Sequence, residues 1–333
     1  MLKNRSQANI LYIDLSKKDY YIKNRPELLD KYIGGTGIAA QLLLEECPEG
    51  CDPLSPESPI ILAVGPLTPF FPLASKTVAL FKSPLTGNLG ESHCGGRSAI
   101  SIASAQLTAI VIKGKSKKPV FLTIDNERVY FKDATTLWGM DSNFTTGRIL
   151  RQHEKGSGIR TIMRIGKGGE NKVLFSGVNV ETFRHFGRLG LGAVFGSKHL
   201  KALVITGQST LEVTDNKEYK KVYKEIYETA TESKLMNKYH DLGTAGNVKG
   251  LSDLGGLPTR NLQSGSFEKA DDISGESFAK EHLGRRLACS HCPVGCIHVA
   301  TLREPDPNDP FFFKTSMIGY DYEPIFAAGS MLG

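Results

Sequence analysis

Long apolar runs and a strong excess of one charge are both missing from this sequence of 333 residues. The longest apolar runs, such as residues 60–64, fall far short of the roughly 20 residues that a membrane-spanning helix needs. Residues 1–7 contain no apolar core of the kind found in secretory signals. We therefore expect a cytoplasmic protein without a membrane span.

The charge balance also argues against a nucleic-acid partner. Lys and Arg number 41 against 35 Asp and Glu, which gives a net charge of +6, and residues 113–118 hold the only short basic run. Nucleic-acid binding needs clustered basic residues with interleaved aromatics, and an anionic small ligand suits this balance equally well. Hydrophobic residues at 40% and charged residues at 23% indicate a globular chain and exclude a disordered or fibrous one.

Three of the six cysteines crowd into eight residues as Cys289-x2-Cys292-x3-Cys296. In a reducing compartment such a group favours metal or redox chemistry over disulfides. Three thiolates on one loop suit three corners of a cubane iron–sulfur cluster, with the fourth ligand supplied from elsewhere. Zinc is the first competitor, with His291 or His298 as the fourth ligand, although both lie too close to the cysteines for an unstrained tetrahedron. Three free buried cysteines are the remaining interpretation.

The pattern of short β-branched runs predicts an α+β fold. Two helices are expected at 37–46 and about 142–154, and an amphipathic helix with Asp215 as its N-cap follows near residue 215. We place a domain boundary at 208/209, which gives a strand-rich domain over 1–208 and a mainly helical domain over 209–333. The strands are expected at 9–14, 60–64, 77–81, 109–112, 120–124, 161–165, 172–175 and 202–206.

A segment rich in arginine and glycine is the second candidate site. Arg184, Arg188 and Lys198 flank four glycines within residues 187–196, so the backbone could approach an anion while the cations neutralise it. The glycine spacing differs from a dinucleotide-binding fingerprint, and tight helix packing is the alternative. Two weaker glycine clusters lie at residues 34–37 and 92–97. Each could bind a ligand through its backbone or could serve tight packing.

Taken together, these motifs resemble the aldehyde:ferredoxin oxidoreductase family of tungsten or molybdenum bis-pterin enzymes. The resemblance extends over the whole chain, and the arginine–glycine segment and the cysteine triplet are its most specific parts. The matching stretches are residues 32–38, 92–96, 184–198, 257–261, 289–296 and 321–323. It implies that residues 1–208 form a β-rich base that holds the pterins, followed by an incomplete, mainly helical domain that binds a [4Fe-4S] cluster.

The resemblance also implies the reaction and its cofactors. The family oxidises an aldehyde with water to a carboxylic acid, and two electrons leave through the [4Fe-4S] cluster to ferredoxin. The metal is held by two pterin dithiolenes, whose phosphates are bridged by Mg²⁺. We accordingly expect a small aldehyde substrate, a ferredoxin-like acceptor and, as a candidate assembly, a homodimer.

Site residues are carried over from the family by position. Cys289, Cys292 and Cys296 are expected to ligate the cluster, while Asp321 and Glu323 are expected to act as acid/base groups at the metal. His93 stands where we expect an asparagine, a change that matters only if the side chain is used. The expected cofactor-binding residues are Lys76, His93, Gly95, Arg184, His185, Gly187 and Arg188.

Three alternatives stay open at this point. A related benzoyl-CoA reductase-type subunit would use the same cofactor scaffold, whereas a cluster-bearing electron-transfer module would lack metal–pterin chemistry. A zinc-stabilised binding domain would be colourless. Residues 322–333 read as the opening of an apolar helix, so we expect a longer protein whose fourth cluster ligand lies past Gly333. None of Cys47, Cys51 and Cys94 occupies the position of that ligand.

Overall fold

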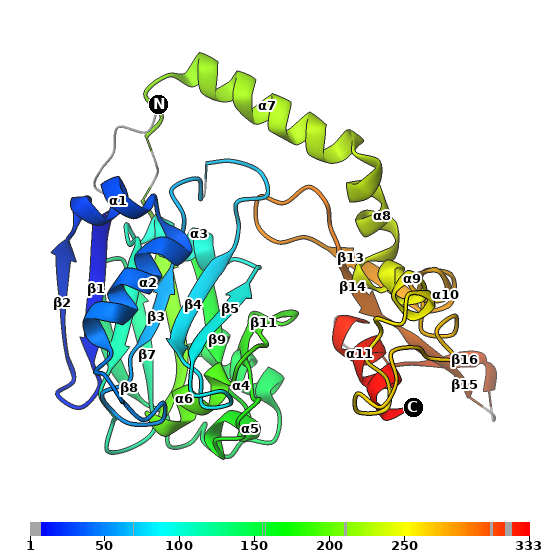
Figure 1. Cartoon of the computed structure of the whole chain (residues 1–333), viewed down its shortest axis with the longest axis horizontal. Coiled ribbons are helices and arrows are strands. Elements are labelled where there is room, and N and C mark those ends of the chain that lie inside the picture. Colours follow the sequence, from blue (N-terminus) through cyan, green and yellow to red (C-terminus); the bar gives the residue numbers. More distant parts are fainter. Residues whose placement is uncertain are drawn as a thin grey trace. The chain divides into compact units, whose positions relative to one another are not determined.

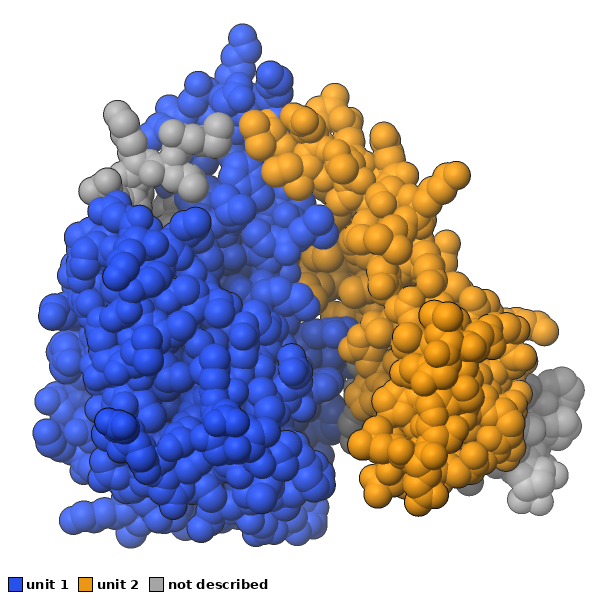
Figure 2. All heavy atoms as spheres, viewed as in Figure 1, with its two compact units in different colours: residues 1–221 blue, residues 222–333 orange. Residues whose placement is uncertain are grey.

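The computed structural model describes residues 8–68, 70–154, 156, 158–209, 212–306, 309–316 and 322–333. The chain forms two compact units, Met1–Lys221 and Val222–Gly333, coloured separately in Figure 2. The division falls inside helix α7 (Asn216–Glu232), whereas the sequence placed a boundary at 208/209.

The first unit is built on two six-stranded sheets (Figure 1). Sheet A has the order β2-β1-β6-β3-β4-β5, and all its neighbours are antiparallel except β1 and β6. Its strands are β1 (Asn9–Asp14), β2 (Asp19–Asn24), β3 (Ile60–Ala63), β4 (Thr77–Lys82), β5 (Leu89–Cys94) and β6 (Ala109–Lys113). Strand β5 is therefore an edge strand of sheet A.

Sheet B has the order β11-β10-β9-β12-β7-β8, and only β7 and β12 pair in parallel. Its strands are β7 (Val120–Asp125), β8 (Arg128–Asp133), β9 (Ile159–Arg164), β10 (Val178–Val180), β11 (Arg184–Phe186) and β12 (Leu200–Gly207). Its edge strand β11 opens the arginine–glycine segment.

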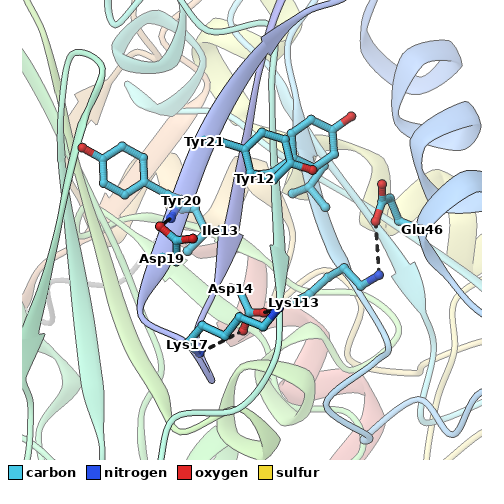
Figure 3. A pocket seen from close by; sticks show the side chains of 10 residues that line it. Tyr12, Ile13, Asp14, Lys17, Asp19, Tyr20, Tyr21, Glu46 and Lys113 are labelled. Atoms are coloured by element: carbon cyan, nitrogen blue, oxygen red, sulfur yellow. Dashed lines mark hydrogen bonds and ion pairs between the residues drawn. The ribbon is translucent and has the colours of Figure 1, made fainter.

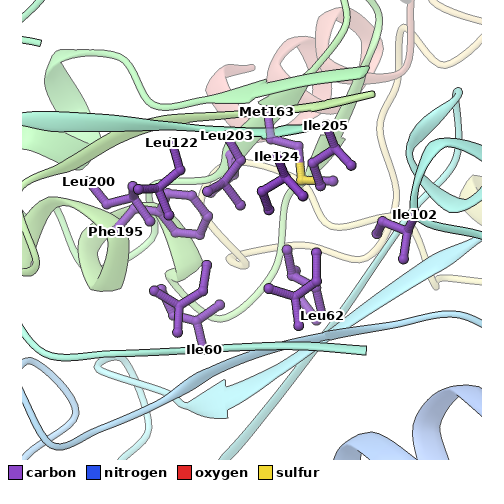
Figure 4. Packing of buried hydrophobic residues seen from close by; sticks show 14 of the residues in the cluster. Ile60, Leu62, Ile102, Leu122, Ile124, Met163, Phe195, Leu200, Leu203 and Ile205 are labelled. Carbon is purple, nitrogen blue, oxygen red and sulfur yellow. The ribbon is translucent and has the colours of Figure 1, made fainter. Parts of the chain in front are cut away.

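The main hydrophobic core lies between the two sheets. Alternate residues of β3 point to opposite faces of sheet A, so Ile60 and Leu62 enter this core while Ile61 enters a second cluster. Figure 4 shows Ile60 and Leu62 facing Leu122, Leu203 and other apolar side chains of sheet B. Burial of these side chains at about 25 cal/mol per Å² is what holds the sheets together.

Helices cover the outer faces of the two sheets. Helix α2 packs Ile38 and Leu42 on sheet A, and helix α4 packs Leu150 on sheet B. Ser142 caps α4 by accepting a hydrogen bond from the Thr145 N–H over 3.2 Å. The helices of this unit are α1 (Pro26–Tyr32), α2 (Gly35–Glu46), α3 (Ser98–Ser104), α4 (Asn143–His153), α5 (Lys167–Glu170) and α6 (Leu191–Ser197).

One predicted strand is wrong. Residues 172–175 form a turn instead, because Lys172 adopts a φ of 56° and the Val173 N–H donates to the Gly168 carbonyl over 2.8 Å. Phe175 is 75% exposed, so this β-branched and aromatic run does not enter the core. The other seven predicted strands overlap observed ones.

The N-cap predicted at Asp215 is confirmed. Its carboxylate accepts hydrogen bonds from the Lys217 and Glu218 N–H groups at 3.0 and 2.9 Å. Helix α7 begins directly after it at Asn216.

The second unit contains short helices and two two-stranded sheets. Its small core stacks the rings of Phe278 and Tyr322, whose centroids are 3.9 Å apart. These strands were not predicted. After α7 come α8 (Lys234–Leu242), η2 (Thr244–Asn247), α9 (Val248–Asp253), α10 (Gly275–Glu281), β13 (Leu283–Leu287), β14 (Ile297–Ala300), β15 (Leu302–Asp306), β16 (Asp309–Ser316) and α11 (Tyr322–Leu332).

The predicted α+β class is confirmed by these mixed sheets and helices. Among the residues that the structure describes, no helix is both long enough and apolar enough to span a membrane.

Candidate functional site

The first group of predicted site residues lies where β4 begins and β5 ends. Thr77 pairs with Cys94 in this antiparallel ladder, so Lys76, one residue before Thr77, lies beside the 93–95 turn. Lys76 and His93 are exposed, whereas Gly95 is buried. The sheet register therefore brings together residues that are nearly 20 positions apart in the chain.

The arginine–glycine segment runs along the same edge. Strands β5 and β11 contact each other, and a Cβ atom built on Gly96 would lie 3.7 Å from Cγ of Arg184. Further along, the Arg188 N–H donates to Ser92 Oγ over 3.3 Å. The Ser83 hydroxyl donates to the Leu189 carbonyl over 2.8 Å, which fixes the end of the segment.

All seven predicted cofactor-binding residues thus gather at one place in the first unit, where the edge strands of sheets A and B lie side by side (Figure 1). Arg184 and His185 are half-buried in β11, and Gly187 and Arg188 are exposed just beyond it. Three cationic side chains and a glycine-containing backbone therefore share one edge.

This donor set fits the anionic end of a phosphorylated cofactor. Exposed Lys and Arg side chains bind phosphate oxygens directly, and arginine does so through two parallel N–H groups. Gly96 has a φ of 91°, which lets the chain turn tightly without a side chain between the backbone and a ligand. The residues present are thus compatible with a pterin phosphate at this edge.

His93 has a defined partner in the structure. Its Nε2 lies 2.7 Å from Glu91 Oε1, and the same carboxylate oxygen accepts a hydrogen bond from the Thr36 hydroxyl at 3.3 Å. Thr36 is in the first turn of α2, so this network joins the weaker glycine cluster at 34–37 to the edge of sheet A.

The last part of the arginine–glycine segment serves packing. A Cβ atom on Gly196 would lie 1.9 Å from the Gly169 carbonyl oxygen, and Gly190 adopts a left-handed φ of 83°. Lys198 is fully buried, and its Nζ donates to the carbonyl oxygens of Ser55 and Pro56 at 3.4 and 3.1 Å. Burial lowers the pKa of Lys198 to about 8. Lys198 therefore supports the interior and does not lie at the cation-rich edge.

The cysteine triplet occupies the loop between β13 and β14 in the second unit. Cys289 is buried, Cys292 and Cys296 are half-buried, and all three are free of disulfides. The Cys292 N–H donates to the Cys289 carbonyl over 3.1 Å, so the first two cysteines share one tight turn. Gly295, with a φ of 65°, reverses the chain before Cys296.

The donor chemistry of this loop suits iron, since three thiols outside any disulfide lie on one short segment. Within the described parts of the chain, no three His, Cys, Asp or Glu side chains converge closely enough to hold a metal ion. The structure thus places the three thiols on one loop but does not gather them into a ligand set.

His240 of α8 anchors the cysteine loop. Its Nδ1 donates to the Val294 carbonyl over 2.7 Å, because that oxygen can only accept. Its own carbonyl oxygen accepts from Arg286 Nε at 3.0 Å and from His298 Nε2 at 2.9 Å. His298 is buried in β14, where burial lowers its pKa. One residue of α8 therefore fixes both strands and the loop that joins them.

Glu323 lies in the first turn of α11 and is half-buried. Its Oε1 accepts a hydrogen bond from the Thr244 hydroxyl, which belongs to η2. Asp321 lies outside the described residues. The structure therefore connects Glu323 to η2 within its own unit.

Sequence reasoning missed several residues that hold the site. Ser92 is inside a motif that the sequence singled out, but its contact with Arg188 depends on a pairing 96 residues away. Glu91 and Thr36 connect α2 to His93. Thr36 lies inside the glycine cluster at 34–37, but nothing local in the sequence indicated its contact with Glu91. His240 likewise lies in an ordinary amphipathic helix.

Comparison with known families covers nearly the whole chain. The family model for the N-terminal domain of aldehyde ferredoxin oxidoreductase matches residues 10–207. The model for domains 2 and 3 of aldehyde ferredoxin oxidoreductase matches residues 221–333. Both compact units therefore have a counterpart in the same family.

Two curated relatives illustrate the similarity. The tungsten-containing aldehyde ferredoxin oxidoreductase of Pyrococcus furiosus is 35% identical over 98% of this chain and 53% of its own length. An aliphatic sulfonate oxidoreductase, WOR-like subunit, of the same organism is 32% identical over 89% of this chain and 49% of its own. The chain thus spans about half the length of these relatives.

A solved structure shares the fold. The active site complex BamBC of benzoyl coenzyme A reductase, in complex with 1,5-dienoyl-CoA, aligns with a TM-score of 0.75 at 22% identity. The alignment covers 99% of this chain and 53% of that one.

Proposed function

The chain belongs to the aldehyde ferredoxin oxidoreductase family, and on that premise we propose that it forms the pterin- and cluster-binding part of an aldehyde-oxidising enzyme. The net reaction is aldehyde plus water to carboxylic acid, two protons and two electrons. The observation that carries the proposal is the gathering of Lys76, Arg184 and Arg188 at the edge formed by β5 and β11, in a chain that both family models match.

A tungsten or molybdenum bis-pterin centre supplies two-electron exchange with the substrate, and a [4Fe-4S] cluster supplies one-electron transfer to ferredoxin. Lys76, Arg184 and Arg188 bind the pterin phosphates. The main chain of His93, Gly95 and Gly187, together with His185, would hold the pterins and their Mg²⁺. These residues fix the orientation of the cofactor and neutralise its charge.

Cys289, Cys292 and Cys296 hold the cluster through their thiolates. His240 orients the loop through its hydrogen bond to Val294, as partners of metal ligands commonly do. A cluster held on this loop would supply one-electron transfer to an acceptor.

Glu323 and Asp321 handle protons in the reaction. Thr244 donates to Glu323 and so sets the direction of its carboxylate. A carboxylate held in this way can accept a proton from water or from the substrate and later release it.

An anaerobic assay of the purified protein with a panel of aldehydes tests this function. The proposal predicts aldehyde-dependent reduction of ferredoxin, with two one-electron equivalents delivered for each carboxylic acid formed. Absence of both products with every aldehyde, in protein that carries metal and pterin, would contradict it.

A benzoyl-CoA reductase-type activity is the second candidate, and the shared fold with that enzyme complex supports it. The same preparation distinguishes the two. Reduction of benzoyl-CoA by a strong one-electron donor, without oxidation of any aldehyde, would favour this alternative.

A further inference from the structure

Two cysteines outside the candidate site lie together at the end of helix α2. Cys47 is the C-cap of this helix, and the Cys51 N–H donates to the Pro48 carbonyl over 3.2 Å. Gly50 has a φ of 69°, which completes the reversal of the chain. The turn therefore places Cys51 four residues after Cys47 on one tight reversal of the chain.

The two thiols are free and differ in their surroundings. Cys47 Sγ lies 3.8 Å from the Pro48 carbonyl oxygen, and Cys51 Sγ lies 3.4 Å from that of Asp52. Cys51 Sγ also lies 3.2 Å from Ser55 Oγ. Ser55 Oγ also accepts the Ser58 N–H at 3.4 Å, and either Ser55 or Cys51 can donate in their mutual contact.

Lysine side chains surround this pair. Lys82 Nζ donates to the Cys51 carbonyl over 2.6 Å. The buried ammonium of Lys198 lies under the same loop, bonded to the Ser55 and Pro56 carbonyls, and interacts electrostatically with Cys51. Lys113 forms an ion pair of 3.1 Å with Glu46, the residue before Cys47 (Figure 3). Three lysine ammonium groups therefore lie around this turn, and one of them is already paired with a carboxylate.

A groove beside the turn gives small molecules access to Cys47. A groove of about 620 Å³ is lined by Cys47, Lys82, apolar side chains such as Leu44 and Leu89, and the turn at 48–50. Both cysteines are partly exposed, in contrast to the buried Cys94.

We propose that Cys47 and Cys51 are a redox-active dithiol that low-molecular-weight disulfides oxidise to an intramolecular disulfide. The Cys51 thiolate attacks one sulfur of the reagent, and the first small thiolate leaves. Cys47 then attacks Cys51 Sγ in this mixed disulfide, and the second small thiolate leaves. The two cysteines lose two electrons, the reagent gains them, and the two thiol protons go to the released thiolates.

The order of attack follows from the two environments. Burial, followed by the charge of Cys51 and the hydrogen bond with it, raises the pKa of Cys47 above its ordinary value. Cys47 therefore holds its proton and is the slower of the two toward an external disulfide. Cys51, beside Ser55 and the lysines, reacts first.

Glutathione disulfide is the probe that tests the proposal. The purified 333-residue chain is incubated with it, quenched by acid and alkylation, and digested with a protease that cleaves after Glu49. This cut separates Cys47 from Cys51, so a disulfide between them leaves two peptides linked. We expect linked peptides in the wild-type chain. Glutathione adducts on either cysteine without linkage, or no reaction at these two residues, would overturn the proposal.

Variants test the order of attack. The Cys47→Ser variant should accumulate a stable glutathione adduct on Cys51. In the Cys51→Ser variant, glutathione disulfide should modify Cys47 about tenfold more slowly than it modifies Cys51 in Cys47→Ser. Equal rates in the two variants would overturn the assigned order. Cys94→Ser, which removes a buried cysteine of the same unit, should leave the linkage unchanged. Lys82→Met should slow the reaction relative to Lys117→Met, which removes an exposed lysine elsewhere, and equal rates would exclude Lys82 as a stabiliser.

Discussion

The Arg188 N–H donates a hydrogen bond to Ser92 Oγ over 3.3 Å, across 96 residues of sequence. This contact ties the arginine–glycine segment to the edge strand of sheet A. Because the main chain of Arg188 is held here, its exposed side chain starts from a fixed position. The side chain is thus available to a ligand at the edge formed by β5 and β11.

Replacement of Arg188 by alanine should release the cofactor. Hydrogen bonds to a charged partner contribute about 1.5–3 kcal/mol, so losing them should weaken phosphate binding by about 10-fold to 100-fold. The main-chain bond to Ser92 survives the substitution, which keeps the fold intact. Pterin and tungsten or molybdenum contents of the anaerobically purified variant measure the effect.

Arg148→Ala is the matched control for this change, because Arg148 is an exposed arginine on α4, outside the arginine–glycine segment. It should retain the wild-type pterin and metal content. If Arg188→Ala retained them as well, the assignment of Arg188 to phosphate binding would be wrong.

Replacement of Glu323 by glutamine separates a catalytic from a structural role. Glutamine keeps an oxygen that accepts the Thr244 hydroxyl, so thermal stability and metal content should stay at wild-type values. Turnover should fall by about 100-fold or more, since the amide cannot exchange a proton at neutral pH. Wild-type turnover with an unchanged pH profile would leave Glu323 as a carboxylate favoured only by its place at a helix start.

His240→Leu should loosen the cysteine loop. The substitution removes the donor to the Val294 carbonyl but keeps the His240 main-chain oxygen that accepts from Arg286 and His298. Loss of a residue that orients metal ligands costs about 10-fold to 100-fold in metal affinity. Iron content after reconstitution with iron and sulfide should therefore fall.

The comparison variants for this prediction are His240→Asn, which keeps a side-chain N–H donor, and His282→Leu, which removes an exposed histidine of the same unit. Both should bind iron more completely than His240→Leu. Equal iron in all three would show that His240 does not position the loop.

Lys201→Met should destabilise the first unit. Lys201 and Glu170 form a fully buried ion pair, and the second oxygen of Glu170 accepts the Gly139 N–H at 2.8 Å. Removing one partner of a buried pair leaves an uncompensated charge and costs about 3–5 kcal/mol of unfolding free energy. Urea denaturation, followed by the fluorescence of the single tryptophan Trp138, measures the free energy of unfolding of this unit.

Lys167→Met breaks the exposed pair with Asp141 and should change the unfolding free energy by less than about 1 kcal/mol. The double variant Lys201→Met with Glu170→Gln should recover part of the loss, because it removes the stranded charge. If Lys201→Met and Lys167→Met lowered the free energy of unfolding by similar amounts, the stabilising role of the buried ion pair would be contradicted.

The parts of the fold with a strong local pattern were predictable. The apolar run at 60–64 becomes β3, and Asp215 caps α7 as its side chain and position imply. Strand β5 was not predicted, because Glu91, Ser92 and His93 carry no β-branched signal and pair only through β4. Residues 172–175 were predicted as a strand because of their β propensity. They form a turn instead, which the hydrogen bond to the Gly168 carbonyl stabilises.

The site was predictable in composition but not in geometry. The cysteine spacing and the arginine–glycine segment are visible in the sequence, whereas the proximity of Lys76 to Arg184 depends on two sheet edges meeting. Lys198 is an example of a residue whose role the motif did not predict. Its position in the motif suggests a ligand contact, whereas the structure buries it against three carbonyl oxygens. Burial is a tertiary property that a short motif does not encode.

Metal and cofactor analysis of the anaerobically purified protein tests the central claim most directly. Tungsten, molybdenum, iron and zinc are counted together with acid-labile sulfide and pterin, on the same sample whose visible spectrum is recorded. The account predicts tungsten or molybdenum with two pterins per metal atom, and iron with an equal amount of sulfide. Iron and sulfide without pterin and without tungsten or molybdenum, or a colourless protein that contains only zinc, would contradict it.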